Sequence, residues 1–414
     1  MISFSVVIIL ARKKWNFGVS LLIGSLIVAV FSSFEVGAEV MIKSVLKSLI
    51  YSIDDGRFEL TTIKLAFVVL FIISLANLMQ RLGSLEKLVN SLRKYFSGRA
   101  LLGITPAVIG LLHVPGGALF SAPIVDEEGK RLQLSREKKA LLNVWFRHIW
   151  FLIYPLSTSI ILISSRDFAD LNIYKLILVQ LPTFFVMIVI GLVIIFRSAP
   201  QMETKGDGHK DDGLIHILPI VTPIVSSIAL TTVLSFDSIS ALLVSLPIGI
   251  LVELLISDVN IENIPVLIKN SLSWKLPLAI VGIMVFRGVI TSSNVVSLIS
   301  NVINSYSLPA LPILIGIPFL LGFVMGYNLG AIALSYPIME PLFSGVSDSI
   351  LVNASILYVS SFIGYLISPL HLCMVVTNEY FEPDLIKLYK DLIPISLLLI
   401  AIHTIFILTL GGTV

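Results

Sequence analysis

Residues 308–339 of this chain read LPALPILIGIPFLLGFVMGYNLGAIALSYPIM. The stretch contains no charged residue, but four prolines and four glycines divide it into two apolar arms, each about half the length of a membrane span. Backbone that leaves the helix inside a bilayer must be covered by protein or line a wet cavity, because lipid offers it no hydrogen-bond partners. The pattern therefore predicts a re-entrant helical hairpin over residues 308–343 instead of one straight transmembrane helix.

A second stretch of the same kind lies 214 residues upstream. Residues 100–125 are also uncharged, and their glycines and prolines predict a first hairpin over residues 100–128. Four pairs of residues coincide when the chain is shifted by 214 positions: Gly116 with Gly330, Ser121 with Ser335, Pro123 with Pro337, and Pro155 with Pro369. One offset that holds over this length indicates an internal repeat.

The composition of the whole chain agrees with a membrane protein. Of its 414 residues, 56% are hydrophobic and only 13% are charged, whereas soluble domains carry about 25% charged residues. The mean hydropathy is +0.99, which excludes both a soluble globule and a disordered chain. The net charge of +2 provides no basic field for nucleic acid, so the expected partner is the lipid bilayer.

A transmembrane helix needs about 20 apolar residues. Residues 2–11 are apolar but too short to cross alone, so this first span must extend to about Trp15, tilt or lie partly in the interface. Eight stretches outside the hairpins are predicted spans: residues 17–34, 60–80, 176–196, 213–236, 238–252, 276–293, 349–378 and 392–414.

These elements recur in one order in each half of the chain. Each half has two spans, an amphipathic segment (residues 40–50 or 261–272), one span, a hairpin, a proline-broken span and a last span. The predicted fold is an all-α polytopic membrane protein with two repeats of about five spans each and two re-entrant hairpins. An odd number of crossings makes the second repeat inverted, with boundaries at residues 1–200 and 213–414 and a linker at 201–212.

Lysine and arginine predict the orientation, because cytoplasmic loops carry an excess of both. Four basic regions lie around residues 12–14, 81–99, 130–139 and 197–210. If these face the cytoplasm of a cell (inner or plasma) membrane, both termini are external. The first hairpin then opens to the cytoplasm and the second to the outside.

Four breaks in helices, two hairpin tips and two proline breaks at Pro155 and Pro369, are expected to converge. A broken helix frees N–H groups that attract anions and carbonyls that hold cations. The predicted lining residues of a substrate site are Pro115, Gly116, Gly117, Ser121, Ser157, Thr158, Asn328, Gly330, Ser335 and His371.

Histidine and arginine near these breaks have competing interpretations. His371 lies in an otherwise uncharged span, where an ionisable residue is a functional hypothesis by default, and it is a candidate proton carrier. We expect Arg147 and His148 to snorkel to the headgroups, His403 to be interfacial, and Cys373 to be a small packing residue.

Motifs for other activities are missing from the sequence. It has no G-x-x-x-x-G-K-[ST] phosphate loop, no H-E-x-x-H zinc motif and no G-x-S-x-G nucleophile motif. A single cysteine, Cys373, allows no cysteine-based metal spacing. We therefore expect no enzyme activity, no cofactor and no metal. A channel or facilitator and, less favoured, a membrane-embedded enzyme remain as alternatives.

Two motif blocks resemble a known family. Residues 113–123 (HVPGGALFSAP) and 368–373 (SPLHLC), followed by TNEYF at 377–381, resemble the uncharacterised prokaryotic family called domain of unknown function 401. That family is placed in the ion transporter superfamily, with gluconate, citrate, dicarboxylate and arsenite carriers. The resemblance implies an elevator-type transporter, in which a transport domain slides against a scaffold domain, and a homodimer.

The hairpin tips depart from the dicarboxylate branch of that superfamily. That branch carries Ser-Asn-Thr at both tips, whereas this chain has PGG at 115–117 and YNL at 327–329. The difference weakens the case for a dicarboxylate and for sodium. The expected function is a secondary active transporter that moves a small anionic organic solute, of carboxylate or sugar-acid type, coupled to Na⁺ or H⁺.

Overall fold

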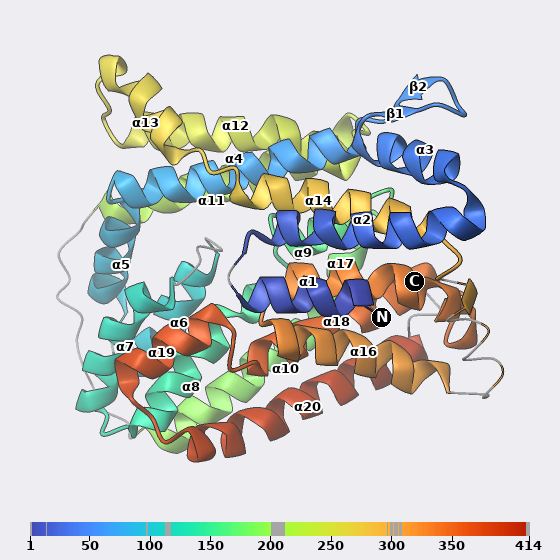
Figure 1. Cartoon of the computed structure of the whole chain (residues 1–414). Coiled ribbons are helices and arrows are strands. Elements are labelled where there is room, and N and C mark those ends of the chain that lie inside the picture. The colour runs from blue at the N-terminus through green and yellow to red at the C-terminus, as the bar shows by residue number, and fades with distance from the viewer. Residues whose placement is uncertain are drawn as a thin grey trace.

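The computed structural model describes residues 2–13, 15–96, 98–111, 117–199 and 212–410, apart from 296, 299–300, 302–304 and 306–308. The described chain is helical except for loops and one antiparallel pair of short strands, β1 (Tyr51–Ser52) and β2 (Arg57–Phe58). Most long helices run roughly side by side (Figure 1). In that view α2, α4, α11, α12 and α14 form an upper group, and α10, α16, α18 and α20 a lower group.

The helices of the first half follow the predicted order. They are α1 (Ile2–Arg12), α2 (Phe17–Val36), α3 (Ala38–Leu49), α4 (Thr61–Arg81), α5 (Ser84–Tyr95), α6 (Arg99–Gly110), α7 (Ala118–Arg131), α8 (Arg136–Arg147), η1 (Ile149–Leu152), α9 (Thr158–Ser164) and α10 (Ile173–Ser198). Side chains begin several of them. Asn16 accepts hydrogen bonds from the N–H groups of Gly18 and Val19, and Ser135 accepts one from Lys138.

The second half repeats this order. Its helices are η2 (Asp212–Ile217), α11 (Leu218–Val233), α12 (Ser238–Ile256), η3 (Ile261–Asn263), α13 (Ile264–Ser271), α14 (Lys275–Ser292), α16 (Ala310–Met325), α17 (Asn328–Met339), η4 (Glu340–Gly345), α18 (Ile350–Ile367), α19 (Leu372–Phe381) and α20 (Leu385–Leu410). The start of α9 at Thr158 and of α19 at Leu372 are 214 residues apart, which is the offset of the sequence repeat.

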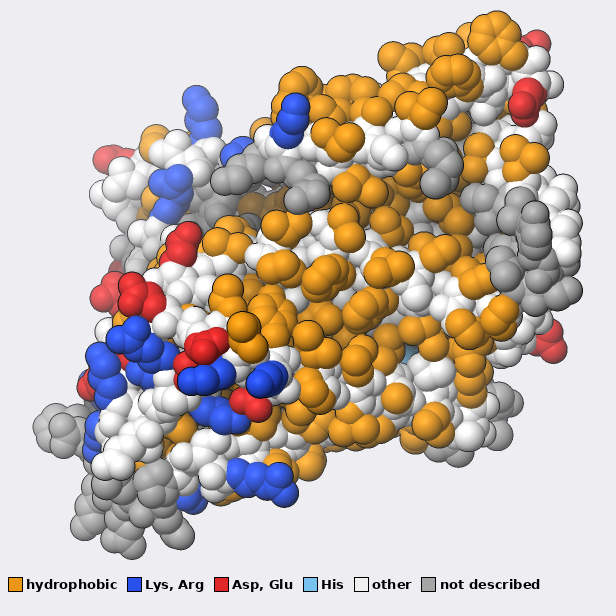
Figure 2. Space-filling view, turned by 60° about the horizontal axis from the view of Figure 1, so that its bottom comes forward, with side chains coloured by type: hydrophobic (Ala, Val, Ile, Leu, Met, Phe, Trp, Pro, Cys, Tyr) orange, Lys and Arg blue, Asp and Glu red, His pale blue; other side chains and the backbone are white. Residues whose placement is uncertain are grey.

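All eight predicted spans coincide with segments long and apolar enough to cross a membrane, among the residues that the structure describes. Figure 2 shows a broad hydrophobic surface across the middle of the molecule, with charged side chains gathered toward one end. Helix α1 begins and α20 ends toward the same side of the molecule (Figure 1). The chain is therefore a multi-pass membrane protein, while the membrane and the side on which the termini lie stay predictions.

Both Gly/Pro-rich stretches form pairs of short helices. Helix α6 packs against α7, and α16 against α17, and none of the four exceeds 16 residues. A helix of that length does not cross a bilayer. The two predicted hairpins are thus present as helix pairs, while their re-entrant placement, the inverted relation of the halves and the repeat boundaries stay predictions.

Glycines hold the second hairpin close to the second broken span. A Cβ added to Gly322 of α16 would overlap the carbonyl of Ser361, and one added to Gly364 of α18 would overlap the carbonyl of Phe319. Small residues allow helix backbones to approach closely in membranes, where tight packing stabilises helix pairs. Helices α16 and α18 are therefore packed as one unit.

Candidate functional site

The first broken span is interrupted between Arg147, where α8 ends, and Thr158, where α9 begins. Proline has no N–H and pushes the residue before it away from helical geometry, so Pro155 prevents the helix from continuing. Turn bonds fill the gap: Tyr154 N–H donates to the Trp150 carbonyl (2.8 Å), and Ser157 N–H donates to the Tyr154 carbonyl (2.9 Å). The break lies where the sequence predicted it.

The second broken span is interrupted between Ile367 of α18 and Leu372 of α19, around Pro369. The N–H of His371 donates to the Ser368 carbonyl (3.2 Å), which closes a tight turn. His371 is the N-cap residue of α19. The turn therefore holds the imidazole at the point where the helix is broken.

The tip of the second hairpin rests directly on this second break. Gly326 has φ of +59°, a conformation that favours glycine. A Cβ there would lie 2.6 Å from the Leu370 carbonyl carbon and 2.7 Å from the His371 nitrogen. Glycine is therefore required at the tip for two reasons, its backbone angle and its contact with the break.

Arg147 lies between the two arms of the first hairpin. A Cβ at Gly110 would overlap the Arg147 carbonyl, and one at Gly117 would overlap its guanidinium. The side chain is 3% exposed. The interpretation that Arg147 snorkels to the headgroups is therefore wrong, because the hairpin arms close over it. Pro115 and Gly116 lie outside the described residues.

A cavity of about 420 Å³ lies where these elements meet. The broken spans and the second hairpin contribute Arg147, His148, Thr158, Ser159, Tyr327, Asn328, Tyr365, His371 and Cys373. Helix α4 contributes Ile72 and Asn77, and α14 contributes Lys275 and Leu276. Thus both halves of the chain line one space, and one of its lining residues, Lys275, is exposed.

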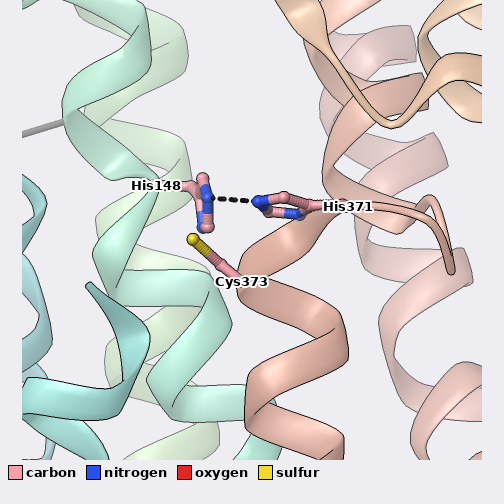
Figure 3. Close-up of side chains that lie close together, drawn as sticks. All are labelled: His148, His371 and Cys373. Atoms are coloured by element: carbon pink, nitrogen blue, oxygen red, sulfur yellow. Dashed lines mark hydrogen bonds between the residues drawn. The ribbon is translucent and has the colours of Figure 1, made fainter. Parts of the chain in front are cut away.

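His148 and His371 approach each other inside this cavity (Figure 3). Their Nε2 atoms are 3.1 Å apart, and the Nδ1 of His148 is 2.6 Å from the Val144 carbonyl. A carbonyl oxygen only accepts hydrogen bonds, so the Nδ1 of His148 carries a proton. Both rings are about 1% exposed, which corrects the expectation that His148 is at the headgroups.

Cys373 completes a compact polar cluster. The Arg147 Nε–H donates to the Cys373 Sγ at 3.4 Å. Two imidazole nitrogens and this sulfur lie within 4.8 Å of one another and are chemically able to hold a metal ion. The guanidinium beside the sulfur disfavours a second cation, and the contact between the imidazoles already has hydrogen-bond length. Both features disfavour a metal ion here, and we assign none to the cluster.

The structure divides the predicted lining residues into two sets. Thr158, Asn328 and His371 line the cavity, and Gly117 contacts Arg147 beside it. Four others are buried elsewhere: Ser121 donates to Asn143 Oδ1 (2.6 Å), Ser335 donates to the Ala331 carbonyl of its own helix (2.7 Å), Gly330 packs on Phe17, and Ser157 is 1% exposed. Direct contact with a solute in the cavity is therefore expected of the first three.

Sequence reasoning missed Arg147, His148 and Tyr365 as lining residues. The available signal was the pair Arg147-His148 shortly before Pro155 in an uncharged region. His403 was also misplaced, because it is fully buried and hydrogen-bonded to Thr183 (2.7 Å) and Ser355 (3.2 Å). The expectation that His403 is interfacial is therefore wrong.

The fold resembles that of a known transporter. The crystal structure of the Alcanivorax borkumensis YdaH transporter, described as having an unusual topology, matches with a TM-score of 0.63. The match covers 98% of each chain at 13% sequence identity, so the likeness concerns the fold alone. A comparison with curated proteins gives no match.

The sequence itself matches a family model over nearly its whole length. The model is described as "Protein of unknown function (DUF401)" and matches residues 1–410. This confirms the resemblance that the two motif blocks predicted. Membership of the wider ion transporter superfamily stays a prediction. The chain belongs to the DUF401 family.

Proposed function

We propose that this protein is a secondary active transporter for a small anionic organic solute of carboxylate or sugar-acid type. The observation that carries the proposal is the cavity at the helix breaks. Its described lining contains Arg147, Lys275 and two histidines but no aspartate or glutamate. Such a lining favours a solute of negative charge.

Size and geometry support a small organic anion. A volume of about 420 Å³ lies in the range of small-molecule sites. Helices α17 and α19 begin at Asn328 and Leu372, which both line the cavity, so two helix N-termini direct their positive ends toward it. A guanidinium binds a carboxylate with two parallel hydrogen bonds, which makes Arg147 the candidate anchor.

An elevator mechanism is part of the proposal. The cavity lies between α4 and α14 on one side and the broken spans with the second hairpin on the other. Helices α2, α4, α12 and α14 pack on one another, as do α16, α18 and α20. We propose that the first group is the scaffold and that the second moves against it with the solute, in a homodimer and coupled to Na⁺ or H⁺.

Proteoliposomes test this proposal. We expect purified protein to catalyse saturable counterflow of at least one anion from a panel of acetate, succinate, citrate and gluconate, and not of choline or glucose. Each anion is assayed with sodium and with sodium replaced by potassium. Flux that does not saturate indicates a channel, turnover of a panel member without transport indicates an enzyme, and no flux of any anion contradicts the proposal.

A further inference from the structure

The two histidines in the cavity come from the two different breaks. His148 follows the last residue of α8, and His371 precedes the first residue of α19. Their Nε2 atoms are 3.1 Å apart, and the ring centroids are 4.6 Å apart with the planes nearly perpendicular (79°). This edge-on arrangement directs one ring nitrogen at the other, as Figure 3 shows.

The hydrogen bonds fix which ring nitrogens of the neutral pair carry its protons. Because Nδ1 of His148 donates to the Val144 carbonyl, the Nε2 of neutral His148 has a lone pair and no proton. The 3.1 Å contact is then a hydrogen bond only if Nε2 of His371 carries the proton between them. His371 Nδ1 is left as a bare acceptor, and it is buried without a hydrogen-bond partner among the described residues.

One added proton changes what the pair offers to a solute. The only ring nitrogen still open to a proton is Nδ1 of His371, since the other three are engaged in the two hydrogen bonds. Protonation there converts a buried acceptor into a charged N–H donor on a ring that lines the cavity. A carboxylate can accept that hydrogen bond, whereas it is repelled by the lone pair of the neutral ring.

The surroundings couple this proton to an anion. Among the described residues, the charged and titratable side chains that share the cavity with the pair are Arg147, Tyr327, Tyr365, Cys373 and Lys275. Arg147 lies beside Cys373, so its charge opposes a second positive charge on the pair. A bound anion cancels this opposition, and the proton and the anion therefore favour each other's binding by equal amounts.

We propose that the pair His148–His371 is the proton-binding element of the site, and that it takes up one proton together with each anion. The inference rests on the transport function proposed above and names H⁺, and not Na⁺, as the coupling ion. Among the groups around the cavity, imidazole is the one whose ordinary pKa lies near neutrality. The Tyr365 ring packs against His371 with ring centroids 4.0 Å apart and the planes tilted by 43°, and its hydroxyl lies 3.5 Å from Nε2 of His148, so Tyr365 contacts both rings.

The experiment uses whichever panel anion the counterflow assay identifies. Proteoliposomes loaded with a pH-sensitive dye and clamped with valinomycin report protons moved per labelled anion. We expect one proton per anion, no need for sodium, and an apparent affinity that falls about tenfold per pH unit above the pKa of the pair. His371→Gln should remove the proton movement and flatten this pH dependence, because it deletes the nitrogen that takes up the proton. His148→Gln keeps that nitrogen but removes the partner that holds the other His371 proton on Nε2, so it should shift the pH dependence.

His403→Gln is the matched control, because His403 is also a buried, hydrogen-bonded histidine but bonds to Thr183 and Ser355 outside the cavity lining. It should keep one proton per anion. Sodium-dependent uptake without proton movement, or an unchanged proton ratio in His371→Gln, overturns the inference while leaving the transport proposal intact.

A second measurement needs no solute. In protein labelled with ¹⁵N-histidine in nanodiscs, His148 and His371 should titrate in one shared transition, and either substitution should abolish it. If no panel anion is transported, independent titration of the two rings contradicts the proposal that the two histidines form one proton-binding element, and a shared transition supports it.

Discussion

The two helix breaks both contain a proline but differ in length and in the residues around them. The first runs from residue 148 to 157 and includes the short helix η1, whereas the second runs only from 368 to 371. The first follows a buried arginine that the first hairpin encloses. The second is a tight turn on which the glycine tip of the other hairpin rests. The offset of 214 residues thus repeats the positions of the breaks, while the chemistry at each break is its own.

The largest effect is expected from Arg147, the charge that distinguishes the first break. Arg147→Ala should lower kcat/KM for anion transport by at least about 30-fold, because truncating one partner of a buried charged contact costs about 2–5 kcal/mol. Lys138→Ala is the control, since Lys138 pairs with Asp391 (2.8 Å) outside the cavity lining. Equal transport by both variants would show that the first break does not supply the anion contact.

Substituting Gly326 tests how much the contact between the second hairpin tip and the second break stabilises the protein. Gly326→Ala should lower the free energy of unfolding by about 2–4 kcal/mol, because it adds left-handed backbone strain and overlap with Leu370 and His371. Gly316→Ala on the same helix is the control, because a Cβ there meets no atom within 4 Å. It should be neutral or slightly stabilising. Thermal unfolding in detergent measures both, and similar shifts would contradict the close contact.

Substituting the proline of each break compares the stability of the two breaks directly. Pro369→Ala should destabilise the protein by about 1 kcal/mol, because proline restricts the unfolded chain and the tip of the second hairpin rests on this short turn. Pro155→Ala should cost less than half of this, since the longer first break is also held by the short helix η1 and by the turn bonds of Tyr154 and Ser157. Denaturant titration of both variants gives the order, and the reverse order would mean that the longer break depends more on its proline.

The smallest effect concerns Asp126, which ties the first hairpin to the helix before the first break. Burial raises the pKa of Asp126, but hydrogen bonds from Lys130 and Lys139 outweigh it and hold that pKa below its ordinary value. This stabilisation is present above the ordinary carboxyl pKa of about 3.9 and is lost as the pH falls through the lower, folded value.

Asp126→Asn should therefore cost at most about 1 kcal/mol at pH 7. Its unfolding midpoint should also fall less than that of the wild type between pH 5 and pH 3. Parallel pH profiles of the two proteins would show that the ion pairs contribute nothing.

Much of the fold followed from the sequence because it depends on local patterns. Uncharged runs predicted the spans, and the clustered glycines and prolines predicted both hairpins and both breaks. The burial of Arg147 and His148 inside the protein could not be predicted, because the basic segment at 130–139 that precedes them favoured a position near the headgroups. The burial of Arg147 depends on Gly110 and Gly117, which are far from Arg147 in the sequence but contact it in the structure.

The same limit applies to the polar residues of the second hairpin. Asn328 and Ser335 lie on one short helix, and the sequence gives no reason to separate them. In the structure Asn328 begins α17 at the cavity, whereas Ser335 bonds back to Ala331 two turns later. Which of the two faces a solute depends on where the helix starts, and that is set by the contact of Gly326 with the second break.

Helices α10 and α20 contain 26 residues each and pack against one another. At a rise of 1.5 Å per residue each is about 39 Å long, but the apolar parts, residues 176–196 and 392–410, are only about 32 Å and about 29 Å long. These apolar parts match a hydrocarbon core of about 30 Å, so the charged ends of both helices extend beyond the core. A bilayer much thinner or thicker than this would force the two helices to incline or the lipid to deform around them, so lipid chain length is a variable that acts on this protein from outside.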